Sequence, residues 1–276
     1  DLAGDPNGTD PVDPDPVDPD PKPEPKPDNA YYSVFSSDTT TVAPGVTQTI
    51  NYALTKDDKQ IVYYIATADI AREDVSIHAN YHDNDPSQGW AMSRVSDQMA
   101  AAQKRHSDPS DAANYVEHYN AVVGVNADFY NMTTGAPSGA LVMDGVEYHG
   151  GTSKNFFAIL KDGTAMIGGP SDYAAYQDQI QEAVGGSVYL VKDGKPVVTS
   201  AADYYNSRHS RTCVGITAEG KVVMMVLDGR QEPFSAGGTA EELAQIMLDA
   251  GCVTAINLDG GGSTTFVAKQ EGSDTL

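Results

Sequence analysis

Strand-like segments joined by short polar turns recur along the chain from Tyr31, and this pattern constrains the fold most strongly. Residues 46–54 and 60–67 are rich in β-branched and aromatic side chains, with Lys-Asp-Asp-Lys between them. Two such runs around a tight turn are typical of an antiparallel hairpin. Similar turns occur at residues 161–163, 192–194 and 218–221. We therefore expect a mainly antiparallel sheet.

Helical segments interrupt these strands. Residues 240–250 place Leu243, Ile246 and Met247 on one apolar face, and Thr239 with Glu242 forms a capping box at the start. Further helices are predicted over residues 96–106, with Ser96 as cap, 111–119 and 172–184, and further strands over residues 74–81 and 121–126. Strands outnumber helices, so the expected class is α+β, a mixed and mainly antiparallel sheet with packed helices.

Residues 1–30 differ in composition from the rest of the chain. They hold nine of the sixteen prolines and nine carboxylates. Proline at every second position favours extended polyproline II, and such a segment cannot bury apolar surface. We expect a disordered acidic linker over residues 1–30 and a single domain over residues 31–276. A stalk of this kind is typical of a secreted or surface-tethered protein, with a cytosolic linker as the alternative.

The charge and apolar pattern exclude some partners. The net charge is −22 at pH 7, so nucleic acid and anionic membrane surfaces are poor partners. The longest apolar run, residues 222–227, is far shorter than the roughly 18 residues that span a bilayer.

Cys213 and Cys252 make no disulfide framework, and we expect buried thiols, with one disulfide as the alternative.

The sharpest local motif is residues 256–265, where a strand leads into an aspartate, three glycines and hydroxyl side chains. Bare amides of consecutive glycines can turn inward and bind an anion such as phosphate. The motif is not a P-loop, because no lysine follows the glycines. A flexible glycine-rich hairpin is the structural alternative.

Three weaker motifs accompany it. Residues 234–239 form a glycine-rich loop that leads into the N-terminus of the predicted helix. This N-terminus could bind an anion, or the loop could only cap the helix. Arg208, His209 and Arg211 gather positive charge that suits phosphate, or salt bridges to the many carboxylates. Asn126 and Asp128 follow a strand, where sites are often built, although an Asx turn explains them equally well.

In this order, the motifs resemble the phosphodiester glycosidase family. The matching residues are Asn-Ala-Asp-Phe-Tyr at 126–130, Gly-Ala-Pro-Ser-Gly at 135–139, and the segments 209–216, 227–230, 237–247 and 255–263. The resemblance covers roughly residues 90–267. The family domain usually continues into another strand past the glycine-rich loop, so we expect that strand to be missing here.

The resemblance implies hydrolysis of a sugar 1-phosphodiester at the sugar C1–O bond, on a cell-surface or extracellular glycan. The oxocarbenium-like transition state needs a carboxylate, whereas the phosphate leaves readily. By this resemblance Asp259 is the principal carboxylate and Asp128 the second acid/base. Phosphate oxygens are assigned to Arg211 and the amides of Gly260, Gly261, Gly262 and Ser263. Substrate orientation is assigned to Asn126, His209, Thr239, Asn257 and Thr264. No cofactor is expected.

Two rival functions remain. A metal-dependent phosphodiesterase would cut the P–O bond, with Asp228, Asp259 and His209 as ligands of a divalent ion. A non-catalytic surface module would bind glycan and use the glycine-rich loops only for structure.

Overall fold

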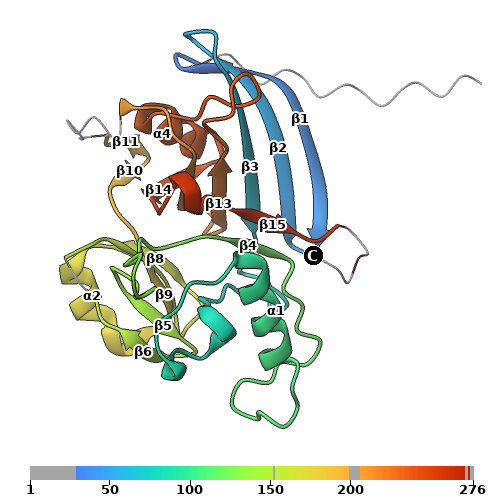
Figure 1. Ribbon diagram of the computed structural model, residues 1–276, viewed down its shortest axis with the longest axis vertical. Helices are drawn as coiled ribbons and strands as arrows, with labels where there is room; N and C mark the ends of the chain where they lie inside the picture. The colour runs from blue at the N-terminus through green and yellow to red at the C-terminus, as the bar shows by residue number, and fades with distance from the viewer. Residues whose placement is uncertain (1–28, 152, 199–205, 271–272, 274–276) are drawn as a thin grey trace, which may run out of the picture.

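The computed structural model describes residues 29–151, 153–198, 206–270 and 273, and its strands form two larger sheets and one small one (Figure 1). Every strand pair described is antiparallel. The expected α+β class with a mainly antiparallel sheet is confirmed.

The large sheet has eight strands. Their order across the sheet is β1 (Tyr32–Ala43), β2 (Val46–Thr55), β3 (Gln60–Ala68), β13 (Val222–Leu227), β12 (Arg211–Thr217), β14 (Cys252–Asn257), β10 (Tyr189–Lys192) and β11 (Lys195–Pro196). Helix α4 (Ala240–Asp249) begins at the predicted Thr239–Glu242 capping box. It packs Leu243, Ile246 and Met247 against one face of this sheet.

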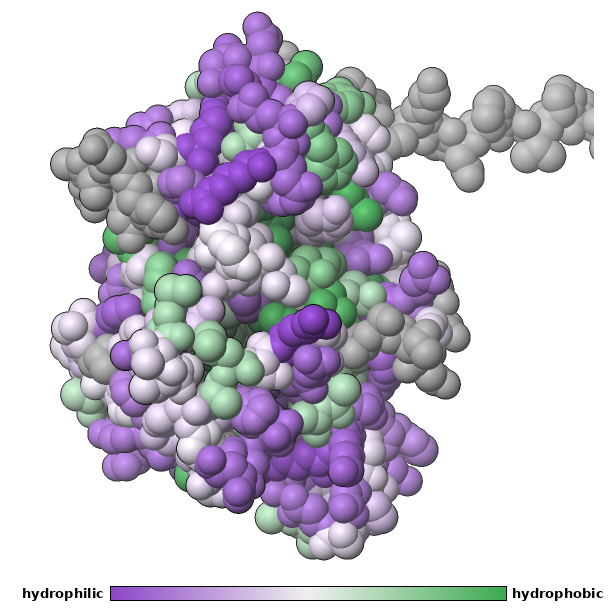
Figure 2. Space-filling view, in the orientation of Figure 1, coloured by the Kyte–Doolittle hydropathy of each residue, from purple (hydrophilic) through white to green (hydrophobic). Residues whose placement is uncertain are grey.

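A five-stranded sheet packs against the opposite face. Its order is β6 (Val146–His149), β5 (Leu141–Met143), β9 (Ile180–Gly185), β7 (Phe156–Leu160) and β8 (Ala165–Gly168). Phe157 and Ile159 of β7 meet Val214 and Ile216 of β12 in one apolar cluster. In Figure 2, hydrophobic side chains gather near the middle of the face drawn, with hydrophilic ones around them.

The remaining elements border these sheets. β4 (Val123–Val125) pairs with β15 (Phe266–Ala268), and α1 (Val95–His106) and α2 (Pro170–Tyr176) are the other α-helices described. Short 3₁₀ turns are η1 (His82–Asn84), η2 (Pro86–Gln88), η3 (Gln177–Gln179) and η4 (Gly261–Ser263). No described helix is both long and apolar enough to cross a bilayer.

Several predicted elements were wrong. Residues 180–185 form the strand β9 and not the second half of a helix, because Ile180 and Ala183 are buried between β5 and β7. Tertiary pairing outweighs local helix propensity there. Residues 74–81 form no strand and residues 111–119 form turns. The predicted strand over residues 121–126 is only the half-buried β4, and α1 is capped at Arg94 and not at Ser96.

Cys213 and Cys252 are buried free thiols, as expected. Burial raises the pKa of both, that of Cys252 to about 12, so neither is a thiolate at neutral pH. The linker was expected over residues 1–30. Of these, residues 1–28 lie outside the described part of the chain.

Candidate active site

Three loops meet at one edge of the large sheet. β13 and β14 both run antiparallel to β12, so their carboxyl ends lie at the edge where β12 begins. The segments Leu227-Asp228-Gly229 and Leu258-Asp259-Gly260 leave this edge on either side of β12. The end of β4 joins them, because the Asp259 amide donates to the Ala127 carbonyl over 2.8 Å.

Asn126 fastens these loops together. Its Oδ1 accepts hydrogen bonds from the Thr212 hydroxyl (2.6 Å) and the Thr265 amide (3.0 Å), and its Nδ2 donates to the Asp259 carbonyl (2.9 Å). All three bonds are internal to the protein. Asn126 therefore positions the backbone that carries Asp128 and Asp259. Because its amide already makes these internal hydrogen bonds, we assign it a structural role and not direct substrate contact.

Asp128 has a strongly perturbed carboxylate. Its Oδ2 accepts a 2.5 Å hydrogen bond from the Gly139 amide, whereas its buried Oδ1 has no hydrogen-bond partner among the described residues. Burial raises the pKa of Asp128 to about 6, against the lowering effects of the Gly139 amide and Lys154. A carboxyl group that titrates near neutral pH can take up or release a proton during catalysis.

Asp259 is the second carboxylate of the site. Burial raises its pKa, while hydrogen bonds from Ser263 and from the Gly260 amide, at 2.8 Å, act in the opposite direction. The positive charge of Lys154 lowers the pKa of both Asp259 and Asp128. Its ammonium also sits 4.9 Å from the centre of the Phe129 ring.

Lys154 was missed from the sequence. It lies in a polar stretch before β7, with no motif around it and no spacing that relates it to Asp128 or Asp259. Only the packing of the five-stranded sheet on the large sheet brings it to the site.

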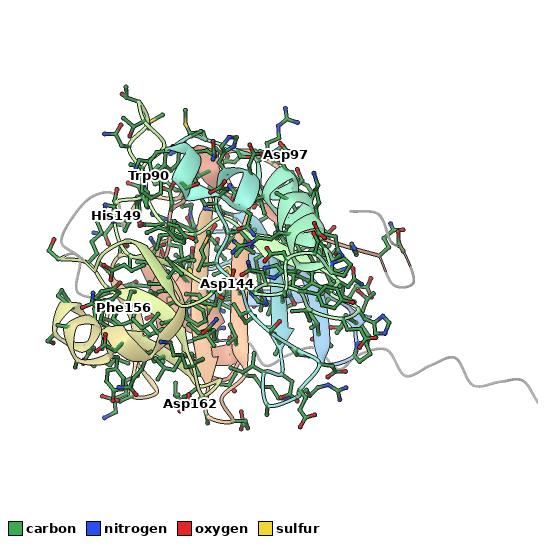
Figure 3. The ribbon with its side chains drawn as sticks, turned by 90° about the horizontal axis from the view of Figure 1, so that it is seen from below. Trp90, Asp97, Asp144, His149, Phe156 and Asp162 are labelled. Carbon is green, nitrogen blue, oxygen red and sulfur yellow. The ribbon has the colours of Figure 1, made fainter. Side chains whose placement is uncertain are left out.

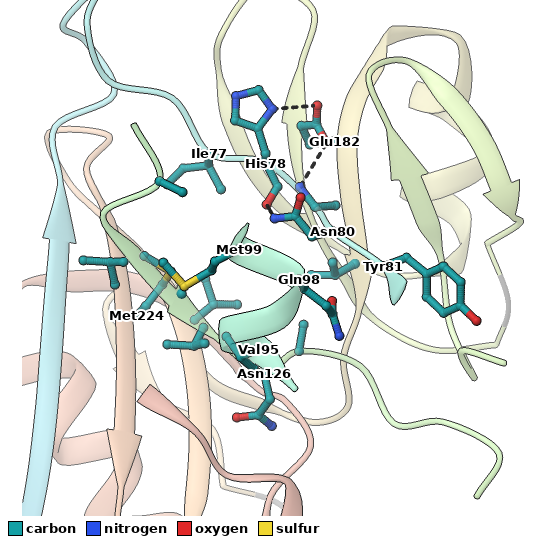
Figure 4. Close-up of a pocket in the computed structure, with 18 of the residues that line it drawn as sticks. Ile77, His78, Asn80, Tyr81, Val95, Gln98, Met99, Asn126, Glu182 and Met224 are labelled. Atoms are coloured by element: carbon teal, nitrogen blue, oxygen red, sulfur yellow. Dashed lines mark hydrogen bonds and ion pairs between the residues drawn. The ribbon is translucent and has the colours of Figure 1, made fainter. Parts of the chain in front are cut away.

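One cavity of about 1110 Å³ contains both carboxylates. Of the predicted site residues, Asn126, Asp128, Asp259, Gly262 and Ser263 line it. Figure 4 shows Asn126 at one side of this pocket, below Val95 and Gln98 of α1. A volume of this size accommodates a sugar together with part of an attached group.

The glycine run packs its backbone tightly against that of Ser210 and does not form an open anion-binding loop. The Gly260 amide donates to Asp259 Oδ1, the Gly261 amide to the Ser210 carbonyl, and the Ser263 amide to the Gly260 carbonyl. A Cβ on Gly260 would lie 2.7 Å from the Ser210 carbonyl oxygen, so only glycine fits there. Three of the four amides predicted to hold phosphate are thus already used.

The prediction for Arg211 was wrong in its geometry. Its side chain is fully buried and donates to the Ser207 carbonyl over 3.1 Å and, more weakly, to that of Gly238 over 3.5 Å. Side chains alternate along β12, so Arg211 and Cys213 face α4 while Thr212 faces Asn126. Arg211 does not line the cavity.

Arg230 is the cation beside the glycine loop instead. Its guanidinium lies 3.8 to 3.9 Å from the position that a Cβ on Gly261 would occupy. It also donates to His209 Nδ1 over 2.8 and 3.1 Å. Arg230 is exposed, so it is open to a ligand at the rim of the site. The motif Leu-Asp-Gly-Arg drew attention to this segment, but not to the arginine.

The other predicted residues surround the site without lining the cavity. Burial, Arg211 and Arg230 lower the pKa of His209, which accepts from Arg230. The Thr239 hydroxyl accepts from the Glu242 amide as helix cap. Asn257 is buried and donates to the Leu258 carbonyl over 2.6 Å. The buried Thr264 hydroxyl has no hydrogen-bond partner among the described residues.

Arg208 forms salt bridges, which was the alternative to phosphate binding for the Arg208–Arg211 motif. It contacts Glu242 at 2.8 Å and Asp57 at 2.6 Å. Asp228 is also occupied, since Oδ1 accepts from the Gly229 amide (2.7 Å) and Gln231 (3.1 Å). Within the described part of the chain, Asp228, Asp259 and His209 do not gather into one group of possible metal ligands.

The sequence and the fold of this chain resemble those of known proteins. The sequence profile of the phosphodiester glycosidase family matches residues 119–275. N-acetylglucosamine-1-phosphodiester alpha-N-acetylglucosaminidase of Mus musculus is 29% identical over 201 residues, which cover 66% of this chain and 38% of that protein. The Bos taurus enzyme of the same name is 32% identical over 163 residues, 52% of this chain and 31% of that protein. The chain thus matches well under half of each relative's length.

A solved structure shares the fold. The catalytic domain of the zebrafish enzyme of that name, auto-inhibited by its pro-peptide, superposes with a TM-score of 0.65 over 84% of this chain and 78% of that domain, at 19% identity. At this identity the likeness concerns the fold alone.

Proposed function

Because the chain belongs to the phosphodiester glycosidase family, we propose that it hydrolyses the bond between a sugar C1 and the phosphate oxygen of a sugar 1-phosphodiester. The observation that carries the proposal is the pair Asp128 and Asp259, two carboxylates of raised pKa in one cavity, both of which feel the positive charge of Lys154. Titratable groups perturbed by burial and by a charged neighbour cluster at catalytic sites.

The chemistry follows from these charges. Cleavage of C1–O leaves positive charge on the sugar ring, which Asp259 stabilises, and negative charge on the departing phosphate. Asp128, with a pKa of about 6, takes a proton from the attacking water. Lys154, Arg230 and the loop around Gly262 and Ser263 supply the positive or donor groups for phosphate oxygens, in place of Arg211.

The relatives' names suggest the first substrate to test, an N-acetylglucosamine-1-phosphodiester. The acidic, proline-rich residues 1–30 suit an exported or surface-tethered protein that acts on an extracellular glycan. A net charge of −22 favours carbohydrate over nucleic acid as the partner.

Hydrolysis of that substrate in ¹⁸O-labelled water tests the proposed bond cleavage. We expect the label in the C1 hydroxyl of the released sugar, measured by mass spectrometry. Label in the phosphate would mean P–O cleavage and would support the phosphodiesterase. Glycan binding without turnover of sugar 1-phosphodiesters would support the non-catalytic module.

Gly185→Ala should impair catalysis without direct contact between residue 185 and the substrate. A Cβ at this position would lie 2.6 Å from Oδ2 of Asp128 and 2.6 Å from Cα of Gly139, so the carboxylate must move. A displacement near 1 Å costs about 10²-fold in rate. We expect kcat to fall by about that factor, measured by steady-state kinetics.

Gly169→Ala is the control for this substitution, because its Cβ would meet only ordinary contacts, the closest at 3.5 Å. Its kcat should remain within about twofold of the parent protein. Equal kcat for Gly185→Ala and the parent protein would show that the position of Asp128 is unimportant.

A further inference from the structure

A second cluster of ionisable side chains borders the large cavity and does not include the two catalytic candidates. It combines His78, His106, the last residue of α1, Asp144 in the turn between β5 and β6, and Glu182 on β9. One possible ligand atom each from His78, His106 and Asp144 lies within 4.8 Å of the others. Figure 3, which views the molecule from below, shows Asp144 near the centre of the molecule and not at its outer edge.

The hydrogen bonds of the two histidines direct one ring nitrogen of each into the cluster. His106 Nδ1 lies 2.8 Å from the Asn114 carbonyl, which can only accept, so Nδ1 carries the proton and Nε2 keeps its lone pair. His78 Nε2 lies 2.9 Å from the Ser76 hydroxyl. A second-shell hydrogen bond of this kind orients a metal-binding histidine.

The inward nitrogen of His78 faces two carboxylates. His78 Nδ1 is buried and lies 3.5 Å from Glu182 (Figure 4) and 3.9 Å from Asp144. Glu182 and His106 are almost fully buried, at 3% and 2% exposure. The cluster therefore has two imidazole and two carboxylate groups turned toward one another.

The charge of the cluster favours a cation. Asp144 and Glu182 carry two negative charges, and Arg105, 3.0 Å from Asp144, supplies one positive charge. With neutral histidines one negative charge is left without compensation in a buried site, which is costly.

We propose that His78, His106, Asp144 and Glu182 bind a divalent transition-metal ion, best matched by Zn²⁺. Imidazole and carboxylate ligands in a four-coordinate set suit zinc, with bonds of about 2.0 to 2.2 Å. Such a tetrahedron holds its ligand atoms about 3.3 Å apart. The ligand atoms of His78, His106 and Asp144 lie within 4.8 Å of one another and would move closer on binding, and Glu182, 3.5 Å from His78, completes the set. Four protein ligands leave no open position, so the ion is structural and not catalytic.

The ion would join segments that are far apart in the chain. It ties α1 and the stretch before η1 to β9 and the β5–β6 turn of the five-stranded sheet. His78 and His106 both precede residue 119, where the family match begins, so family membership does not imply this site. His78 and Glu182 also line the large cavity, which gives an ion access.

Titration of the chelator-treated protein with Zn²⁺, followed by calorimetry, tests the site. We expect one ion per chain with a dissociation constant below about 1 μM, and thermal unfolding several degrees higher at saturation. His106→Gln should weaken binding at least about 100-fold. His118→Gln is the matched control, since His118 also lies near a carboxylate, 3.6 Å from Glu117, but on the surface. It should bind like the parent protein.

Two further measurements keep the test decisive if His106→Gln does not fold. Asp144→Asn removes a ligand oxygen charge at a backbone φ of +50°, which asparagine tolerates well. X-ray absorption of the zinc-loaded parent protein should show nitrogen and oxygen ligands only, with imidazole scattering.

Binding equally strong in Asp144→Asn or His106→Gln, or a calorimetric titration with no stoichiometric uptake, would overturn the proposal. It would mean that the cluster is a purely structural hydrogen-bond and ion-pair network. All these readouts are independent of glycosidase activity.

Discussion

Asp128→Asn should lower kcat/KM for a sugar 1-phosphodiester by about 10³-fold. The amide keeps the shape of the side chain but cannot take the proton of the attacking water. Asp128 is the group with a pKa of about 6 in the cavity, close to the pH at which such a transfer is most effective. Steady-state kinetics at pH 7 measure the loss, and a variant within threefold of the parent protein would remove Asp128 from the mechanism.

The pH profile gives the sign of this role. A base must be deprotonated, so kcat/KM of the parent protein should fall as the pH drops through about 6, the pKa of Asp128. Lys154 lowers that pKa, so Lys154→Met should move the fall to higher pH. A fall on the alkaline side of pH 6 would assign Asp128 as an acid instead.

The stability of Asp128→Asn should change in the opposite direction to its activity. The pKa of Asp128 is raised in the folded protein from 3.8 to about 6, so its favourable contribution is present below pH 4 and lost as the pH rises through 6. Above that pH the buried charge costs as much as about 3 kcal/mol. Urea unfolding should therefore find Asp128→Asn at least as stable as the parent protein at pH 8, which separates lost catalysis from lost folding.

Local patterns predicted the frame of this site well. The hairpin turns, the Thr239–Glu242 capping box and the strand that leads into Asp259 depend on neighbours within a few residues, so the sequence contains them directly. The same patterns place Asp128 and Asp259 at strand ends. That both line one cavity follows from the pairing of distant strands.

Side-chain direction and long-range packing account for the errors. Arg211 was assigned to phosphate on the positive charge of its motif and on the family resemblance, but the alternation of β12 turns it toward α4. Ile180–Gly185 looked helical until two strands enclosed it. Lys154 and the raised pKa of Asp128 arise from the contact between the two sheets, which no local motif encodes.

Asp259→Asn should abolish measurable turnover, with a loss of at least about 10³-fold in kcat. The developing charge at C1 would then face a neutral amide in a partly buried site, where an electrostatic interaction is worth most. The chain provides a closely matched control, because Leu227-Asp228-Gly229 repeats the Leu258-Asp259-Gly260 arrangement across β12. Both aspartates accept from the amide of the following glycine, at 2.7 and 2.8 Å.

The two aspartates differ in what surrounds them, and this difference decides between the mechanisms. Asp259 lines the cavity with Asp128, whereas Asp228 does not and is held by Gln231. A glycosidase built on Asp259 and Asp128 therefore predicts that Asp228→Asn keeps most of the activity. A metal-dependent phosphodiesterase needs Asp228 as a ligand and predicts that both variants are inactive. Comparable losses in the two variants, with both proteins folded, would favour P–O cleavage, since only a shared ligand role makes these aspartates equivalent.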